Sequence, residues 1–340
     1  MKVSRKNVLN AVFLLLVFAF TLYYVFAGED LNAIIGYLRT ADIRYWIAGV
    51  MLVVLFIEGE SVVIFYLMKN FGQPVLFSHC ILYSFVGFFF SLITPSATGG
   101  QPMQIYFMRR DKLSLSISTL VLMVVTITYK MVLVVLGAVI LIVRPSVIMH
   151  YLQPIIGWCY LGIALNVVCV GGMLILIICP KIAKNMMVGA VTFTAKLFRL
   201  KNGQKWITKI DKGMVKYLHA ADFFKKHMLF IVNAFLITCV QRGLLFAVTY
   251  LTYLSFDLHQ EGFWTITALQ GMISVSVDML PLPGGMGISE KLFMAVFSGM
   301  TGSSLALPLM IVSRGISFYT QLLISAVMTV AAYFKIKENS

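Results

Sequence analysis

Charged residues are scarce in this chain. Asp, Glu, Lys and Arg make up 12% of its 340 residues, whereas 60% are apolar, and the mean hydropathy is +0.92. A soluble fold of this length needs far more charge to cover its surface. The composition therefore excludes a soluble globular protein and predicts an all-α polytopic membrane protein.

The chain also lacks the signatures of metal, redox and nucleotide chemistry. Its five cysteines and five histidines are scattered, without a CxxC pair or a zinc-ligand spacing, which argues against a disulfide framework or a metal site. It contains no Walker loop for ATP and no nucleophile elbow of a hydrolase. Basic residues do not alternate with aromatic ones, as they do in proteins that bind single-stranded nucleic acid. We therefore expect no cofactor, no metal ion and no nucleic-acid partner.

Positive charge is present, and its placement is informative. The net charge is +14, and residues 180–227 contribute +9 of it, from eleven Lys or Arg against two Asp. Basic loops of membrane proteins stay in the cytoplasm. Together with the basic N-terminus and with Lys335 and Lys337 near the C-terminus, this segment predicts that both termini are cytoplasmic.

Six apolar runs have the twenty or so residues that a helix needs to cross a bilayer. They predict six full transmembrane helices, at about 8–27, 45–68, 115–143, 155–179, 228–256 and 304–333. Two further stretches, 76–110 and 262–300, are broken near their middles. The charge rule predicts that both fold as re-entrant hairpins, the first entering from the cytoplasm and the second from the opposite side.

Glycine and proline interrupt both hairpins. Non-helical backbone at membrane depth persists only where it is buried in protein or lines a polar cavity. A pair of such breaks in corresponding halves indicates the binding site of a transporter built from inverted repeats. We therefore expect a single domain, 1–340, with an inverted repeat of about 45–143 and 228–333. The backbone of the two re-entrant loops is assigned to Pro95, Gly99, Gly100, Pro102, Pro283, Gly284, Gly285 and Gly287.

Two alternatives concern these polar and glycine-rich segments. The glycines could serve only to let helices pack closely. The basic segment 180–227 contains a stripe of lysines, at Lys205, Lys209, Lys212 and Lys216, opposite an apolar arc. Such an amphipathic helix suits an anionic inner leaflet, but an ordinary linker helix packed on the bundle fits the same pattern.

Eight charged side chains lie within the predicted membrane segments, where each costs roughly 2.5–3.5 kcal/mol on insertion scales. They are Glu58, Glu60, Lys130, Arg242, Asp278, Glu290, Lys291 and Arg314. Four are acidic and four are basic, so they could form internal salt bridges that hold helices together. Because the two breaks converge on the same depth, we favour a polar cavity that receives a charged or zwitterionic ligand.

Within this cavity we expect the cations Arg242, Arg314 and Lys130 to hold a phosphate, with the two arginines binding it in bidentate fashion. Acidic side chains would hold an amine or carry coupling protons, and they are Asp278, Glu58 and Glu290. Glu58 is preferred to Glu60 because it lies nearer the centre of its span, and residues two apart diverge by about 200° on a helix.

The hairpins would add neutral donors to this site, namely Thr94, Thr98 and Gln101. Half-helices that start at Pro102 and Gly287 would also point free N–H groups and positive dipole ends at the midplane. Lys291, near an interface, is expected to extend its ammonium group toward water instead.

The hairpin motifs are similar to those of a known family. Thr94-Pro-Ser-Ala-Thr-Gly-Gly-Gln-Pro102 with Tyr106-Phe-Met-Arg-Arg110, and later Leu282-Pro-Gly-Gly-Met-Gly-Ile-Ser-Glu290, resemble the lysylphosphatidylglycerol synthase transmembrane, or flippase-like, family. That family includes the membrane half of the bacterial multiple peptide resistance factor. The resemblance implies a bacterial plasma-membrane protein that moves phospholipid head groups between leaflets, in the best-known members an aminoacylated phosphatidylglycerol.

Two departures from the family pattern stand out. Gln101 occupies a position where many relatives carry an acidic residue, and the chain ends at Ser340 without the soluble synthase domain of the full-length resistance factors. The sequence thus predicts translocation of an anionic or zwitterionic phospholipid. Alternatives are a lipid-modifying transferase, such as a phosphatidylglycerol lysyltransferase, a transporter of a small water-soluble solute, and a membrane partner of a separate lipid synthase. A homodimer is also expected.

Overall fold

The computed structural model describes residues 42–94, 97–179, 226–285 and 287–336, with a few isolated positions elsewhere. The predicted first span, the lysine stripe and Pro95 lie outside these residues. The described ranges consist of helices and the turns between them. In chain order the helical elements are α3 (Ile43–Asn70), α4 (Phe77–Ile93), α5 (Gly100–Arg110), α6 (Leu115–Val143), α7 (Ser146–Leu152), η2 (Gln153–Ile155), α8 (Ile156–Ile178), α11 (Met228–Ser255), α12 (Phe263–Val277), η3 (Pro283–Gly285), α13 (Ile288–Thr301), α14 (Ser303–Arg314), η4 (Gly315–Thr320) and α15 (Gln321–Lys335).

Five helical segments in the described part of the chain are long and apolar enough to cross a membrane. They are Ile43–Asn70, Leu115–Val143, Ser146–Ile178, Met228–Ser255 and Leu305–Lys335. Each overlaps one of the predicted spans. The prediction of an all-α polytopic membrane protein is therefore confirmed.

The first glycine- and proline-rich break separates α4 from α5. α4 ends at Ile93 because Thr94 is extended (φ −112°, ψ 146°), a conformation that a following proline favours. α5 begins at Gly100, two residues before the expected start at Pro102. Proline fits the first turn of a helix because the N–H that it lacks has no partner there.

The second break separates α12 from α13. α12 ends at Val277 and α13 begins at Ile288. Between them Gly284 and Gly287 have φ of 56° and 82°, a region that side chains with a Cβ rarely adopt. Glycine at these positions therefore lets the chain reverse here at little conformational cost.

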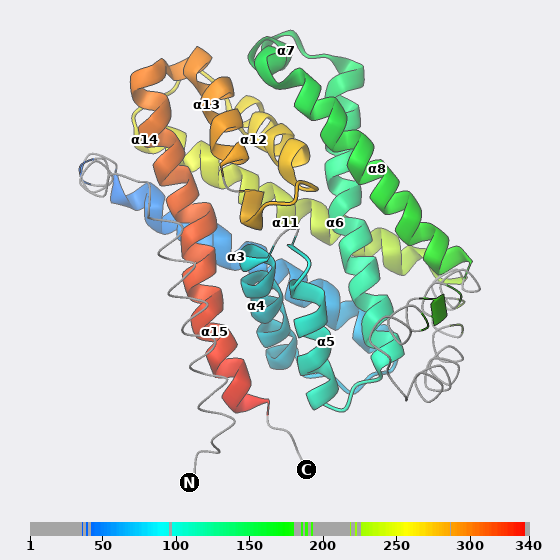
Figure 1. Cartoon of the computed structure of the whole chain (residues 1–340). Coiled ribbons are helices and arrows are strands. Elements are labelled where there is room, and N and C mark those ends of the chain that lie inside the picture. The colour runs from blue at the N-terminus through cyan, green and yellow to red at the C-terminus, as the bar shows by residue number, and fades with distance from the viewer. Residues whose placement is uncertain are drawn as a thin grey trace.

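Figure 1 shows how the two hairpins are arranged. The α4–α5 hairpin rises from the lower end of the molecule, and the α12–α13 hairpin descends from the upper end. Their tips approach each other near the centre, where η3 packs against α4. The paired central helices α3 and α11 cross behind them. Two opposed helical hairpins thus exist, whereas their re-entrance into a bilayer stays a prediction.

The packing partners in the two halves of the chain correspond. α3 packs on α4 as α11 packs on α12, and α5 packs on α6 as α13 packs on α14. Each hairpin also packs on the last helix of the other half, α4 on α15 and α12 on α6. A pseudo-twofold repeat would produce this correspondence.

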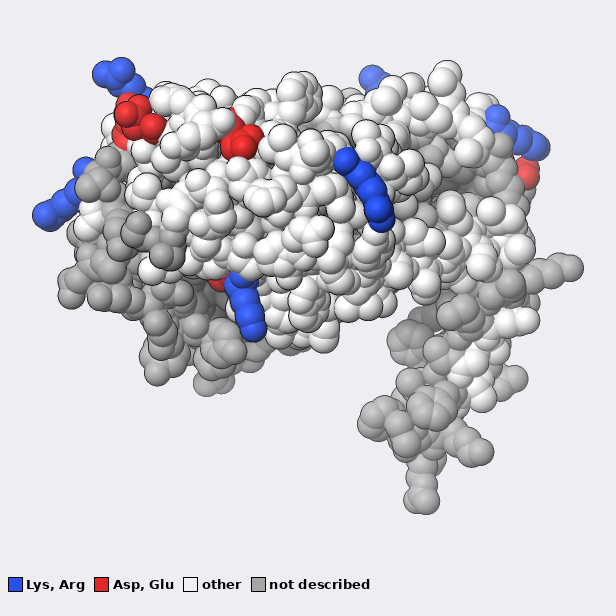
Figure 2. All heavy atoms as spheres, turned by 90° about the horizontal axis from the view of Figure 1, so that it is seen from above, with Lys and Arg blue, Asp and Glu red and all other residues white. Residues whose placement is uncertain are grey.

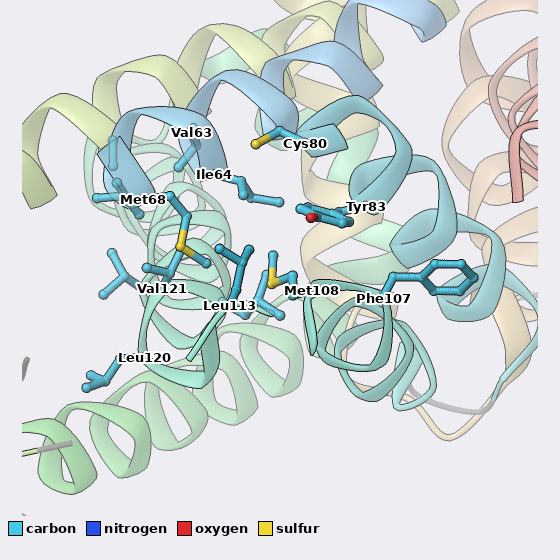
Figure 3. Close-up of a cluster of buried hydrophobic side chains, with 14 of the residues drawn as sticks. Val63, Ile64, Met68, Cys80, Tyr83, Phe107, Met108, Leu113, Leu120 and Val121 are labelled. Carbon is cyan, nitrogen blue, oxygen red and sulfur yellow. The ribbon is translucent and has the colours of Figure 1, made fainter. Parts of the chain in front are cut away.

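Two large apolar clusters hold the bundle together. One surrounds the first hairpin, where Tyr83 of α4 and Met108 of α5 pack against Ile64 of α3 and Val121 of α6 (Figure 3). The other surrounds the second hairpin and includes Phe293 and Phe297 of α13, whose rings stack 4.2 Å apart. Each hairpin is therefore seated in its own core.

Few charges lie on the outside of this bundle. Seen from above, the surface carries isolated Lys, Arg, Asp and Glu side chains on an otherwise uncharged face (Figure 2). α8 exposes large apolar side chains along its length, as expected for a helix in contact with lipid. They are Trp158, Tyr160, Leu161, Val167, Val168, Ile175 and Ile178.

Candidate functional site

Arg242 is the most deeply buried charged side chain of the candidate site. It lies on α11 with 3% of its surface exposed. Its guanidinium carbon is 3.8 Å from the centre of the Tyr129 ring and 5.3 Å from that of Phe246. Its Nε has no hydrogen-bond partner, and none of the described carboxylates pairs with it. Aromatic faces stabilise the cation in part, but no anion neutralises it.

Lys130 lies one position after Tyr129 on α6 and reaches across to the second hairpin. Its Nζ is 2.6 Å from Oδ2 of Asp278, and the two side chains are 13% and 11% exposed. Nζ also lies 3.0 Å from the sulfur of Met279. Asp278 directly follows α12. This ion pair therefore joins α6, the last helix of the first half, to the hairpin tip of the second half.

Arg314 forms the second interior ion pair. Its Nε and Nη2 both lie 2.8 Å from Oε1 of Glu290, near the start of α13. Nη2 also donates to the carbonyl oxygen of Gly284 at 3.2 Å, and the guanidinium lies over the ring of Phe318. Arg314 thus ties the middle of the second break and the start of α13 to α14.

The helix that carries Arg314 is not regular. The single span expected at about 304–333 is divided into α14, the π-helical segment η4 (Gly315–Thr320), and α15. π-Helical turns are rare and occur most often at functional sites. Here the change begins at the residue after Arg314, beside the second hairpin tip.

Glu60, rather than Glu58, makes the hydrogen bond into the bundle. The Nε2 of Gln104 on α5 donates to Oε1 of Glu60 at 2.6 Å. Gln104 reaches α3 across Gly87 of α4, because a Cβ at Gly87 would clash with the Gln104 amide. Tyr129 lies within electrostatic range of Glu60, Asp278 and Arg242. The polar groups of the central helices thus gather around this one ring.

The tip of the first hairpin is held by its own polar groups. Thr94 Oγ1 donates to the carbonyl oxygen of Phe90 at 2.6 Å and accepts from the Gly99 N–H at 2.9 Å. Gln101 donates to the hydroxyl of Thr126 on α6, and Thr98 is exposed. Of the three side chains expected to donate to a ligand, Thr94 and Gln101 therefore hold the hairpin, and Thr98 is exposed.

Glycine in the first hairpin also has a packing role. A Cβ at Gly100 would clash with Ser91 Oγ and would lie 2.7 Å from the carbonyl oxygen of Gly87. A Cβ at Gly99 would lie 2.6 Å from Cγ2 of Thr94. Close packing of α5 on α4 thus accounts for both glycines, as the alternative interpretation holds.

The predicted cations do not share one partner. Arg314 is bound to Glu290 and Lys130 to Asp278, while Arg242 lies on Tyr129. Lys291 is exposed. The internal salt bridges that sequence analysis weighed against a ligand site are therefore present for two pairs, and Arg242 is left over.

Sequence analysis missed the contributions of Tyr129 and Gln104. In the sequence, Tyr129 could have been noticed as a polar side chain within a strongly apolar helix, and Gln104 as one next to a glycine-rich break. Spacing alone could not show that these side chains meet, since Tyr129 lies on α6, Gln104 on α5 and Glu60 on α3.

One comparison with known proteins identifies a family. The model of a family described as "Lysylphosphatidylglycerol synthase TM region" matches residues 8–325. No curated protein matches the chain. The match includes both hairpins and every interior charge described above.

Proposed function

The chain belongs to the lysylphosphatidylglycerol synthase transmembrane family, and we propose that it moves an anionic or zwitterionic phospholipid between the leaflets of the plasma membrane. Family membership supports a function connected with membrane lipid. The head group would pass between the two hairpins near the centre of the bundle, while the acyl chains stay in the bilayer. In this proposal both hairpins are re-entrant, the halves form an inverted repeat, and both termini are cytoplasmic.

The observation that carries the proposal is the unpaired charge of Arg242. Burying an ionised group without an opposite charge is strongly unfavourable, and charged residues inside membrane segments most often mark a substrate pathway. Arg242 is nearly fully buried, its Nε is unsatisfied, and no described carboxylate neutralises it. A phosphate would supply both the missing charge and the missing acceptor.

The two interior ion pairs are contacts within the bundle that could break as the head group passes. Lys130–Asp278 connects the second hairpin to α6, and Arg314–Glu290 connects the same hairpin to α14. A zwitterionic head group offers a phosphate to the cations and an amine to the carboxylates, so it could replace each pair in turn. Alternating access by movement of one repeat against the other is the usual mode of such folds.

The test is a leaflet-accessibility assay in proteoliposomes with fluorescent phosphatidylglycerol and its lysyl derivative. We compare the native protein with Arg242→Gln. The control is Lys291→Gln, which removes one positive charge from an exposed position. A hydrogen bond to a charged group contributes about 1.5–3 kcal/mol, so we expect Arg242→Gln to slow translocation by roughly ten- to a hundredfold.

Three results would argue against this assignment. Equal rates in Arg242→Gln and the native protein would remove Arg242 from the site, and a loss in Lys291→Gln of the same size would make the effect one of net charge. If the native protein moves neither lipid, translocation of these lipids is wrong. Uptake of a water-soluble solute, or product formation from lipid, would then favour one of the alternatives.

A further inference from the structure

Glu60 is an interior carboxylate that has no positively charged partner among the described residues. The interior carboxylates Asp278 and Glu290 each pair with a cation at 2.6 and 2.8 Å. In the described part of the chain no Lys, Arg or His side chain lies within the 4.0 Å of Glu60 that defines such a pair. Its partner is the neutral amide of Gln104.

The helices packed against α3 do not supply the missing charge. α4 contains no Asp, Glu, Lys or Arg, and its His79, at the far end of the helix, pairs with Asp111. In α5 the two arginines are in the last turn, five residues or more from Gln104. The π-helical segment η4 has no charged residue. These elements therefore leave the carboxyl of Glu60 with amide and apolar neighbours.

The cations on the remaining neighbours, α6 and α11, do not pair with Glu60 either. Lys130 is bound to Asp278, and Arg242 lies on the ring of Tyr129. Tyr129, a neutral group, lies in electrostatic range of Glu60. On α3 itself, Glu58 carries the same charge as Glu60, and Lys69 is more than two helical turns away.

The free-energy cost of burying this carboxyl depends on whether it is protonated. As an anion it pays a desolvation penalty that the Gln104 amide offsets only in part. As a neutral acid it keeps the hydrogen bond to its carbonyl oxygen and avoids the penalty. Acidic residues within transmembrane segments commonly carry protons for this reason.

The position of Gln104 links this protonation to movement of a hairpin. Gln104 lies on α5, just after the first break, and reaches Glu60 only by crossing α4 at Gly87. If the first hairpin shifts relative to α3, the Glu60–Gln104 hydrogen bond breaks. Water that enters with the head group would then stabilise the anion, and the proton would leave.

From this arrangement we infer that Glu60 binds one proton and releases it again in each transport cycle, so that lipid translocation is coupled to the proton gradient. The step is a protonation alone: a carboxylate takes a proton from one aqueous side and gives it to the other, with no other bond changed. The inference rests on the proposed function, and it names the energy source for the same site.

The experiment uses proteoliposomes containing fluorescent phosphatidylglycerol, with an imposed pH difference and the membrane potential clamped to zero. One pH unit is a tenfold ratio of proton activity. With one proton per lipid, the native protein should therefore shift the leaflet ratio of the probe by roughly tenfold for each unit. Glu60→Gln should still exchange lipid but lose this dependence on the pH difference.

Glu261→Gln is the matched control, because it makes the same chemical change in the loop before α12, outside the proposed site. It should respond to the pH difference as the native protein does. If translocation by the native protein ignores the pH difference, or if Glu60→Gln still follows it, proton coupling through Glu60 is wrong while translocation itself stands.

A second measurement does not depend on transport. Infrared difference spectra between acid and alkaline pH should contain a carbonyl component from the protonated carboxyl of Glu60, which is lost in Glu60→Gln and retained in Glu261→Gln. A band unchanged by Glu60→Gln would overturn the inference. If this band behaves as expected but the native protein moves no lipid, the proposed function fails and Glu60 remains a proton-binding group.

Discussion

At the scale of single residues, the interior charges of this protein differ in what neutralises them. Lys130 and Arg314 have carboxylate partners from the second hairpin, whereas Arg242 contacts Tyr129 and Phe246 and has no carboxylate partner among the described residues. Burying an ion pair costs more free energy than burying a neutral pair of similar size. Deleting one member of a buried pair costs more still, because the other charge is left buried without compensation. The two pairs therefore contribute to the structure, and we propose Arg242 as the residue that binds the ligand.

The Lys130–Asp278 pair provides a test of this distinction. Lys130→Met leaves Asp278 buried without its cation, so we expect a loss of about 3–5 kcal/mol in the free energy of unfolding. Adding Asp278→Asn removes the stranded charge and should recover most of the loss. Unfolding in mixed micelles, followed by circular dichroism, measures both variants.

If the double variant is as unstable as Lys130→Met alone, the pair does not account for the loss. The same reasoning applies to Arg314→Ala, because this variant would leave Glu290 without its cation. A loss of activity there would mix stability with binding, and for this reason Arg242→Gln is the better probe.

At the scale of helices and hairpins, the two breaks reverse the chain by different means. The first uses Thr94 as a cap, with close contact between α4 and α5 at Gly99 and Gly100. The second uses positive φ at Gly284 and Gly287 and is held by Arg314. The first break is therefore held by packing within its own hairpin, and the second by a side chain from another helix.

Gly100→Ala should therefore disrupt the first hairpin. Its Cβ would clash with Ser91 Oγ and with the backbone oxygen of Gly87, which cannot rotate away. We expect overpacking to cost about 1–3 kcal/mol, and translocation to fall with it. Thermal unfolding in detergent provides the measurement.

Gly171→Ala is the control for this variant. Gly171 lies within α8, and a Cβ there meets nothing within 4 Å. Alanine is the better helix former by about 0.5–1 kcal/mol, so the control should be neutral or slightly more stable. Equal melting temperatures for Gly100→Ala and the native protein would show that the hairpin can accommodate a side chain at this contact.

At the scale of the whole molecule, the two halves are interlocked. Each hairpin packs on the last helix of the other half, and Lys130–Asp278 bridges the halves near the centre. The lower end in Figure 1 holds the end of α3, the α5–α6 turn and the end of α15, where Lys69, Lys112 and Lys335 occur. The charge rule therefore predicts that this end faces the cytoplasm.

Cysteine labelling tests this topology. In a variant without the five native cysteines, we would place single cysteines at Gln73, before the first hairpin, at Lys112, after it, and at His259, before the second hairpin. A membrane-impermeant thiol reagent applied outside should label only His259→Cys. Labelling of Lys112→Cys from outside would mean that 76–110 crosses the membrane fully and is not re-entrant.

Much of the fold could be predicted from the sequence because its causes are local. Apolar runs of sufficient length form spans, and a proline after Thr94 or glycines near 284 end helices wherever they occur. These effects depend on a few neighbouring residues. The positions of the described spans and both breaks agree with the prediction for that reason.

The division of the last span could not be predicted in this way. Sequence analysis expects one helix at about 304–333, but a π-helical segment follows Arg314. Gly315 alone does not require it, and the contacts of Arg314 with Glu290 and Gly284 come from another hairpin. Such contacts are invisible to local propensity.

The sequence by itself determined the class of protein, the family, the two breaks and the set of charged side chains that must find partners inside. Which partner each charge finds was decided only by the tertiary structure. Helices far apart in the chain bring Lys130 to Asp278 and Gln104 to Glu60, across separations of 148 and 44 residues. Because ion pairing depends on distances of a few ångströms, only the packed bundle could leave Arg242 without an anion and Glu60 without a cation.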